Sequence, residues 1–141
     1  MQIRFEDFKD EIDILIEFLT SDTWEFHGTP NPKPEGIRKG YENQLYTGDD
    51  CKTFWVISDQ DVRVGTIRIY DLQDGDPLFD IRILSNYKGM GVGTTTVKWL
   101  VDYIFNNFPD KFETDVRSHT NVPISYIITN FLFNKRVDIR I

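Results

Sequence analysis

The chain has 141 residues, 40% of them hydrophobic and 28% charged, which is the size and composition of one soluble globular domain. Its formal net charge of -7 repels nucleic acid and anionic membranes, so we expect neither as a partner, whereas a basic or amine substrate would be attracted. No apolar run approaches the roughly 18 residues of a membrane-spanning helix, so none is expected.

The first half of the chain predicts a strand, two helices and a hairpin. Apolar residues that alternate with polar ones indicate strands, and apolar residues spaced by three or four indicate helices. Three prolines close together after Gly28 exclude a helix there and leave an extended loop. The expected elements are a strand at 3–5, a helix at 10–19, a polar helix at about 34–46, and strands at 53–57 and 62–70, which form an antiparallel hairpin with a bulge at Gly65.

The second half of the chain predicts alternating strands and helices. The expected elements are a strand at 78–84, a helix at 91–107, a strand at 112–117, a short helix at 121–133 and a last strand at 134–141. The whole order predicts an α/β (α+β) fold, with a single mixed sheet, a central hairpin and strand, and helices on both faces. We expect residues 1–141 to form a single domain.

Thiol and imidazole side chains are few. Cys51 is the single cysteine and has no partner for an internal disulfide, which favours a reducing, cytoplasmic compartment. His27 and His119 stand apart from one another, and no group of His and Cys has the spacing of metal ligands. We therefore expect no metal site.

A glycine-rich turn, Lys88–Thr94, lies between a predicted strand and a predicted helix. Its three glycines let the backbone approach a ligand closely. Free amides at the helix start and the helix dipole favour an anion. Lys88 adds a cation beside a bound phosphate, and the threonines at 94–96 place three hydroxyl groups in the first helical turn. The turn is therefore predicted to bind phosphate groups.

Two common phosphate-binding motifs fit this turn poorly. A P-loop requires Gly-Lys followed by Ser or Thr, which does not occur here. A dinucleotide fingerprint spaces its glycines as Gly-x-Gly-x-x-Gly after a first parallel strand, whereas the strand before this turn follows an antiparallel hairpin. A turn that only packs the helix against the sheet is the remaining alternative.

The segment Lys88–Gly93 resembles the signature of the GNAT superfamily of N-acetyltransferases. That signature has Arg or Gln, two residues, Gly, one residue, and Gly or Ala, and Lys88 stands where Arg or Gln is usual. The preceding strand and the linker Ser85–Tyr87 fit the same pattern, and the layout of elements fits over most of the chain. Residues 24–34 look like the branch that includes the ribosomal-protein N-terminal acetyltransferases.

The resemblance implies acetyl-CoA as the co-substrate. Amides of the turn would hold the diphosphate, and the backbone of the preceding strand would pair with the pantetheine arm as an extra strand does. The implied cofactor-binding residues are Ile83, Leu84, Lys88, Gly89, Met90, Gly91, Val92, Gly93, Thr94 and Asn121.

The resemblance also implies direct attack of a neutral amine on the thioester, so a base must remove a proton from the ammonium group. Family members use Glu or Asp for this step, and many use a Tyr as the acid toward the leaving thiolate. Asp80, Glu25 and Tyr126 are the catalytic candidates, with Glu113 and Asp115 as further bases. A solvated strand face or a salt bridge is the structural alternative for each carboxylate, and packing is the alternative for Tyr126.

The sequence departs from the family after Asn121. Where the family has Tyr, Lys and Gly, this chain has Ile128, Asn130 and Leu132, and Tyr126 lies two residues before the Tyr position. Relatives in this branch usually continue through another strand or hairpin. We therefore expect a truncated or altered C-terminal strand region whose open edge or apolar patch a homodimer would cover.

The sequence thus predicts an N-acetyltransferase that acts on the amine of a small molecule, peptide or protein. The alternative is an acyl-CoA-binding module with weak or no catalysis, because the C-terminal motif is degraded. An unrelated nucleotide-binding regulator would fit the glycine turn, but the P-loop and dinucleotide features are missing. Nothing in the sequence encodes the acceptor.

Overall fold

The computed structural model describes residues 1–24, 27, 29–73, 78–108, 113–117, 125–130 and 135–140, the last three ranges only as strands. Its elements are β1 Ile3–Asp7, α1 Ile12–Thr20, α2 Pro34–Glu42, β2 Lys52–Ser58, β3 Arg63–Tyr70, β4 Leu78–Ile83, the short 3-10 helix η1 Ser85–Tyr87, α3 Val92–Asn107, β5 Glu113–Arg117, β6 Ser125–Asn130 and β7 Lys135–Arg140.

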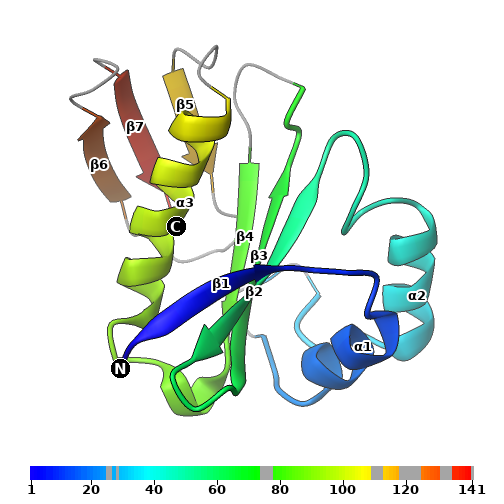
Figure 1. Cartoon of the computed structure of the whole chain (residues 1–141). Coiled ribbons are helices and arrows are strands. Elements are labelled where there is room, and N and C mark those ends of the chain that lie inside the picture. The colour runs from blue at the N-terminus through cyan, green and yellow to red at the C-terminus, as the bar shows by residue number, and fades with distance from the viewer. Residues whose placement is uncertain are drawn as a thin grey trace.

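The first four strands form an antiparallel sheet in the order β1-β2-β3-β4. Helices α1 and α2 lie on one side of this sheet and α3 lies on the other (Figure 1). The expected mixed fold with helices on both faces is confirmed. Because β4 is the last strand of the ladder, one edge of its backbone carries no strand partner among the described residues.

Neighbouring residues of β2 build both layers, because successive side chains of a strand point to opposite faces. Trp55 and Ile57 pack with the helices α1 and α2. Phe54 and Val56 pack with α3. All four side chains are at most 4% exposed. This double burial is why 53–57 reads as a continuous apolar run in the sequence.

The expected irregularity near Gly65 is present. The pairing of β2 with β3 shifts register between Val56 and Ile57, and Val56 is the residue opposite Gly65. A Cβ atom on Gly65 would lie 2.6 Å from the backbone oxygen of Arg82 and 2.7 Å from Cδ1 of Ile83. Only glycine therefore lets β3 approach β4 this closely.

Strands β5, β6 and β7 form a second sheet in the order β5-β7-β6, with β5 parallel and β6 antiparallel to β7. Strand β5 lies near β4, but no ladder joins them in the part of the chain that the structure describes. The expectation of one continuous sheet is therefore corrected to two sheets. Periodicity predicts strands but not which edges pair, because pairing is a long-range choice.

The short helix expected at 121–133 is wrong, because its described part is strand β6. The core of β6 is Tyr126-Ile127-Ile128-Thr129, four residues whose aromatic or β-branched side chains favour a pleated surface. These local preferences outweigh the helical periodicity of the apolar residues. The last expected strand is confirmed as β7.

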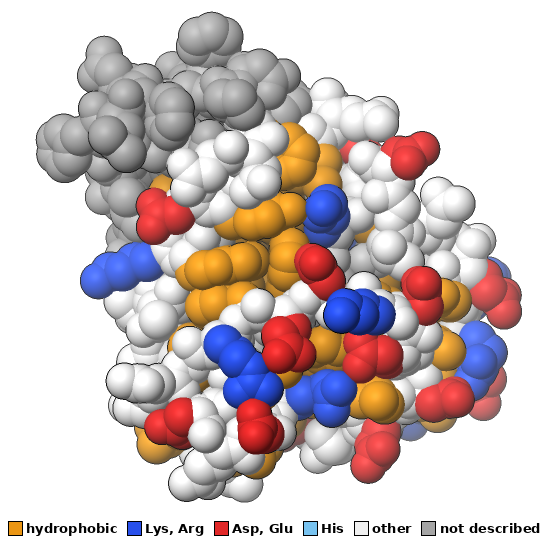
Figure 2. Space-filling view, in the orientation of Figure 1, with side chains coloured by type: hydrophobic (Ala, Val, Ile, Leu, Met, Phe, Trp, Pro, Cys, Tyr) orange, Lys and Arg blue, Asp and Glu red, His pale blue; other side chains and the backbone are white. Residues whose placement is uncertain are grey.

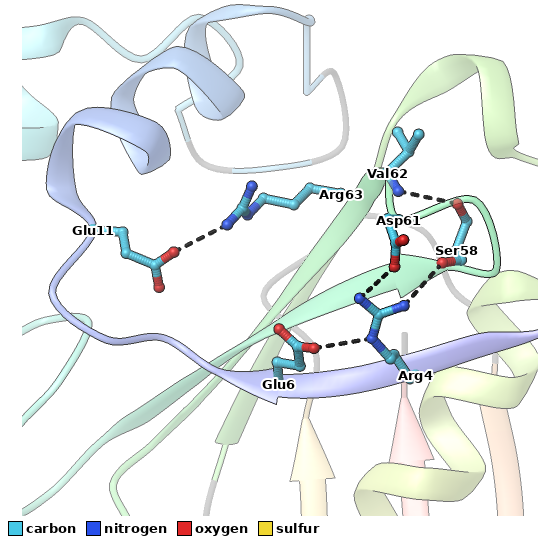
Figure 3. Close-up of polar contacts among 7 residues, drawn as sticks. All are labelled: Arg4, Glu6, Glu11, Ser58, Asp61, Val62 and Arg63. Carbon is cyan, nitrogen blue, oxygen red and sulfur yellow. Dashed lines mark hydrogen bonds and ion pairs between the residues drawn. The ribbon is translucent and has the colours of Figure 1, made fainter.

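Two ion pairs fasten the N-terminal segment to the sheet (Figure 3). Arg4 on β1 reaches Asp61 in the β2–β3 turn, with 2.7 Å between Nη2 and Oδ1. Arg63 at the start of β3 donates through Nη2 to Glu11 Oε2 at 3.0 Å, just before α1 begins. These contacts fix where α1 enters its layer.

Hydrophobic side chains gather on the face where α3 lies beside β1 (Figure 2). Half-buried aromatic residues pack there, with ring centroids 4.3 Å apart for Phe5 and Trp99 and 5.2 Å apart for Trp99 and Tyr103. No helix among the described residues is long and apolar enough to cross a membrane.

Candidate functional site

The glycine-rich turn follows β4 and η1 and leads into α3. Gly89 has φ of +77° and Gly91 has φ of +80°, which is left-handed backbone that residues with a Cβ adopt only at a cost. Gly91 is the residue that caps the start of α3. Two of the three glycines are therefore required by the path of the backbone itself.

The turn is open to a ligand. Added Cβ atoms at Gly89, Gly91 and Gly93 would meet no other atom within 4 Å. The first helical hydrogen bond of α3 runs from the amide of Thr95 to the carbonyl of Gly91 at 3.1 Å, so the amides of residues 92–94 precede the helical ladder. An anion at the turn would meet these amides and the positive end of the helix dipole.

The threonine hydroxyls of α3 are not equivalent. Thr94 and Thr95 are exposed beside the turn. Thr96 is fully buried, so it cannot contact a ligand at the surface. The expectation of three available hydroxyls is thus corrected to two, because the third falls on the core face of the helix.

Asp22 fastens the approach to the turn. Its carboxylate accepts hydrogen bonds from the amide of Ser85 at 2.6 Å and from the Ser85 hydroxyl at 2.9 Å. The backbone hydrogen bond from Ser85 lowers the pKa of Asp22, and the charge of Lys88 lowers it further. The end of α1 thereby holds η1 and the turn in place.

The open edge of β4 is defined by the alternation of its backbone groups. The amide of Leu84 donates to the carbonyl of Val64 on β3 at 2.9 Å. Bonds toward one neighbour alternate along an antiparallel strand, so Ile81 and Ile83 direct their backbone groups away from β3. The carbonyl of Ile81 indeed contacts His27 on that outer side. Of the two residues expected to carry a pantetheine track, Ile83 lies on the open edge, and Leu84 has its amide turned inward.

A buried polar cluster of His27, Asp80 and Arg82 lies on the α1 and α2 side of β4. Nε2 of His27 is 2.9 Å from Oδ1 of Asp80, and Nε of Arg82 is 3.1 Å from Oδ2. The three side chains are 10%, 8% and 15% exposed, respectively. Trp24 packs against the cluster, with its ring 5.5 Å from the guanidinium carbon of Arg82. Each charge is thus neutralised inside the protein.

The tautomer of His27 follows from its neighbours. Nε2 lies close to Asp80 Oδ1 and also 3.1 Å from the carbonyl oxygen of Ile81, which has the better hydrogen-bond alignment. Both neighbours only accept hydrogen bonds, so Nε2 carries a proton. The lone pair of the neutral ring is therefore on Nδ1, which is buried and has no hydrogen-bond partner among the described residues.

Asp80 is held in its charged form. Burial by itself would raise its pKa, but the hydrogen bond from His27 and the positive charges of Arg82, His27 and Arg68 outweigh burial and hold the pKa at about 2. A carboxylate with such a pKa is a poor proton acceptor at neutral pH. This environment suits Asp80 to orienting His27.

A cavity of about 310 Å³ lies between this side of the sheet and the helices α1 and α2. Asp80 and Arg82 contribute to its wall, together with Arg68 from β3. Its remaining lining comes from α1, the 29–33 loop, α2, residues 45 and 46, and the threonines at 53 and 66 of the sheet. The volume is that of a small-molecule site.

The other sequence candidates lie elsewhere. Glu25 and Asn121 are outside the described residues. Tyr126 is on β6, and Glu113 and Asp115 are on β5, whose side chains are not described. Among the residues that the structure describes, no three His, Cys, Asp or Glu side chains gather as they would around a metal ion.

His27 was missed by sequence reasoning. It stands 53 positions before Asp80, within no motif, and a single His gives no local signal of a partner. Only the return of the chain along β4 brings the two side chains together.

The family model for the acetyltransferase (GNAT) family matches residues 16–123, which includes the glycine turn, the open edge of β4 and the buried cluster. The chain belongs to this family. No curated protein sequence matches the chain.

Several solved structures share the fold at low sequence identity. A chimera containing the spermidine N-acetyltransferase of Vibrio cholerae has a TM-score of 0.61 at 15% identity, covering 75% of this chain and 64% of that chain. A domain from Methanocaldococcus jannaschii has a TM-score of 0.61 at 15% identity, covering 76% of this chain and 72% of that chain. The spermidine N-acetyltransferase of V. cholerae in complex with CoA and spermine has a TM-score of 0.59 at 15% identity, covering 74% of this chain and 64% of that chain. This GNAT chain therefore spans less than two thirds of the length of those spermidine N-acetyltransferases.

Proposed function

We propose that this GNAT chain transfers the acetyl group of acetyl-CoA to a primary amine of a small molecule. The observation that carries the proposal is the open glycine turn at the start of α3, next to the free edge of β4. The turn has room for a diphosphate, since no atom lies within 4 Å of the Cβ positions of its three glycines. When bound, the thioester of acetyl-CoA supplies the activated acetyl group.

The turn and the strand would bind different parts of the co-substrate. Residues Lys88–Thr94 would hold the diphosphate through amides and the positive helix end. The outward backbone groups of Ile83 would bind the pantetheine arm as a strand does, because the outward carbonyl of Ile81 already accepts a hydrogen bond from His27. Asn121 stays a predicted contact to the same molecule.

His27 is our candidate for removing the proton from the attacking ammonium. The carbonyl of Ile81 and the carboxylate of Asp80 together keep the proton of His27 on Nε2, which leaves the lone pair on Nδ1 to accept a proton. The ring lies against the carbonyl of Ile81, on the edge where the thioester is expected. In this scheme Asp80 is a positioning residue, and Glu25 and Tyr126 stay predicted as additional base and acid.

The class of acceptor is part of the proposal. Solved relatives include a V. cholerae enzyme with bound spermine, a small-molecule amine. The 310 Å³ cavity supports an acceptor of that size for this chain. A ribosomal-protein or other peptide N-terminus, the homodimer and the cytoplasmic location stay predictions from the sequence.

An acyl-CoA-binding module without efficient catalysis is the second candidate. The observation that favours it is strand β6, which stands where the family pattern led us to expect a helix carrying its acid. A protein of this kind would keep the turn and the β4 edge but release little product.

The deciding experiment mixes the protein, acetyl-CoA and a panel of primary amines and follows release of free thiol. We expect turnover, with kcat reduced about 100-fold in His27→Gln while the affinity for CoA is kept. The pH profile of kcat should lose its acidic limb in this variant, which a purely structural role would not cause. A thermal shift with CoA without any thiol release would support the binding module and contradict the proposed transfer.

A further inference from the structure

The cavity on the α1 and α2 side of β4 has a charge pattern of its own. Its lining residues are Leu15, Leu19, Thr29, Pro32, Lys33, Gly36, Ile37, Gly40, Leu45, Tyr46, Thr53, Thr66, Arg68, Asp80 and Arg82. Apolar side chains of the helices form the roof, and polar side chains of the sheet form the floor. The cavity is therefore amphipathic, with most of its charged side chains on the floor.

The floor holds two guanidinium groups and one carboxylate, so it has one surplus positive charge. Asp80 is already engaged by His27 and by Nε of Arg82. Nη1 of Arg82 is buried and has no hydrogen-bond partner among the described residues. Arg68 donates from Nη1 to the carbonyl of Leu45, a neutral group. Within the part of the chain that the structure describes, no second carboxylate lines the cavity to balance the surplus charge, whereas Lys33 adds a further cation from an exposed position.

A half-buried cation without a counter-charge is unfavourable beside an apolar roof, so the floor favours an anionic group on its ligand. A guanidinium matches the planar carboxylate in charge and in hydrogen-bond geometry. One carboxylate neutralises the surplus charge of the floor, whereas a dianionic phosphate would exceed it. A polyamine would bring several more positive charges close to Arg68, Arg82 and Lys33. The single carboxylate of the cavity, Asp80, is already paired and could not balance them.

We propose that the cavity binds the carboxylate of the acceptor, which is a small amino carboxylate such as a free amino acid. The inference rests on the proposed function for the reaction that follows binding. Carboxylate recognition by Arg68 and Arg82 would place the ligand beside β4, where Ile81 and His27 mark the open edge. The apolar roof of Leu15, Leu19 and Ile37 would accommodate an aliphatic side chain.

Binding of matched ligand pairs tests the inference without turnover. The full chain, with and without saturating CoA, is titrated calorimetrically with a panel of L-amino acids, their carboxamides and spermidine. A ligand that lacks one charge-assisted hydrogen bond should bind roughly 10- to 100-fold more weakly. We expect at least one amino acid to bind about tenfold or more tightly than its carboxamide.

Two variants separate the cavity from general charge effects. Arg68→Gln should remove the preference for the acid over the amide. Arg38→Gln removes one positive charge from the outer side of α2, where Arg38 pairs with the exposed Asp13, and should keep the preference. Equal binding of acid and amide, tighter binding of spermidine, or no binding of any amino acid would overturn the inference.

Release of free thiol from acetyl-CoA tests the proposed acetyl transfer separately from binding. Amino acids that bind with this preference but accept no acetyl group would contradict the transfer and leave the cavity assignment intact. Acetylation of spermidine or of neutral amines in place of amino acids would support the transfer and refute the amino carboxylate.

Discussion

Strand β4 separates two polar regions that are built in opposite ways. The turn at 88–94 is largely exposed and offers uncharged backbone amides beside the single charge of Lys88. The cluster of His27, Asp80 and Arg82 is buried and made of ionisable side chains. A ligand would complete the first region, whereas the members of the second already satisfy much of one another's charge.

The difference shows where function is robust and where it is fragile. Amide dipoles at a helix start need no counter-charge, so the empty turn costs the fold little. Buried charges depend on each other, and removal of one leaves its partner uncompensated. Loss of a charge from the cluster should therefore cost more stability than a substitution in the turn, where only the left-handed backbone of Gly89 and Gly91 is strained.

The largest effect is expected from Asp80→Asn. This change leaves Arg82 and its buried guanidinium without a carboxylate, so the free energy of unfolding should fall by about 3 to 5 kcal/mol in urea denaturation. Asp13→Asn removes the exposed partner of Arg38 and should leave stability nearly unchanged. Similar stabilities of the two variants would show that the cluster behaves as a surface ion pair.

Gly91→Asp tests the turn. A carboxylate among the amides at the start of α3 should weaken CoA binding by about 100-fold, while open space around the Cβ position lets the fold survive. Gly91→Asn has nearly the same shape and backbone strain without the charge and should lose much less affinity. Calorimetric titration with CoA measures both, and unchanged binding in the Asp variant would reduce the turn to a packing device.

Gly65→Ala disturbs β4, the strand that carries the buried cluster and leads into the glycine turn. The new Cβ would push against the backbone of Arg82 and the side chain of Ile83, so unfolding should become easier by about 2 to 3 kcal/mol. Gly36→Ala in α2 has open space and should stabilise the chain by about 0.5 to 1 kcal/mol. The denaturation midpoints of the Gly65→Ala and Gly36→Ala variants measure this difference. Equal midpoints of the two variants would mean that β3 and β4 can move apart without cost.

The smallest expected effect is the acid sensitivity of the cluster. The pKa of Asp80 is about 2 in the folded chain and 3.8 as its ordinary value, so its charge stabilises the fold above about pH 4. About 2 kcal/mol of this stability should be lost as the pH falls from 4 to 2. The difference in unfolding free energy between the wild type and Asp80→Asn should shrink by that amount. A difference independent of pH would contradict the low pKa.

Net charge and the charge of the cavity floor lead to different expectations for the acceptor. The total of -7 suggests a cationic acceptor, whereas the cavity floor carries surplus positive charge. Exposed charges are screened within about 10 Å by salt, so a distant acidic surface does not determine what a buried floor binds.

The sequence by itself determined what depends on near neighbours in the chain. Alternation predicted β3 and β4, a continuous apolar run predicted β2, helical spacing predicted α1 and α3, and three glycines within five positions predicted the turn that leads into α3. Tertiary structure decided the rest: the break between two sheets, the pairing of His27 with Asp80, and the charge of the cavity floor. The physical reason is range, because backbone preferences act over a few residues, whereas pairing and burial depend on segments that packing brings together from far along the chain.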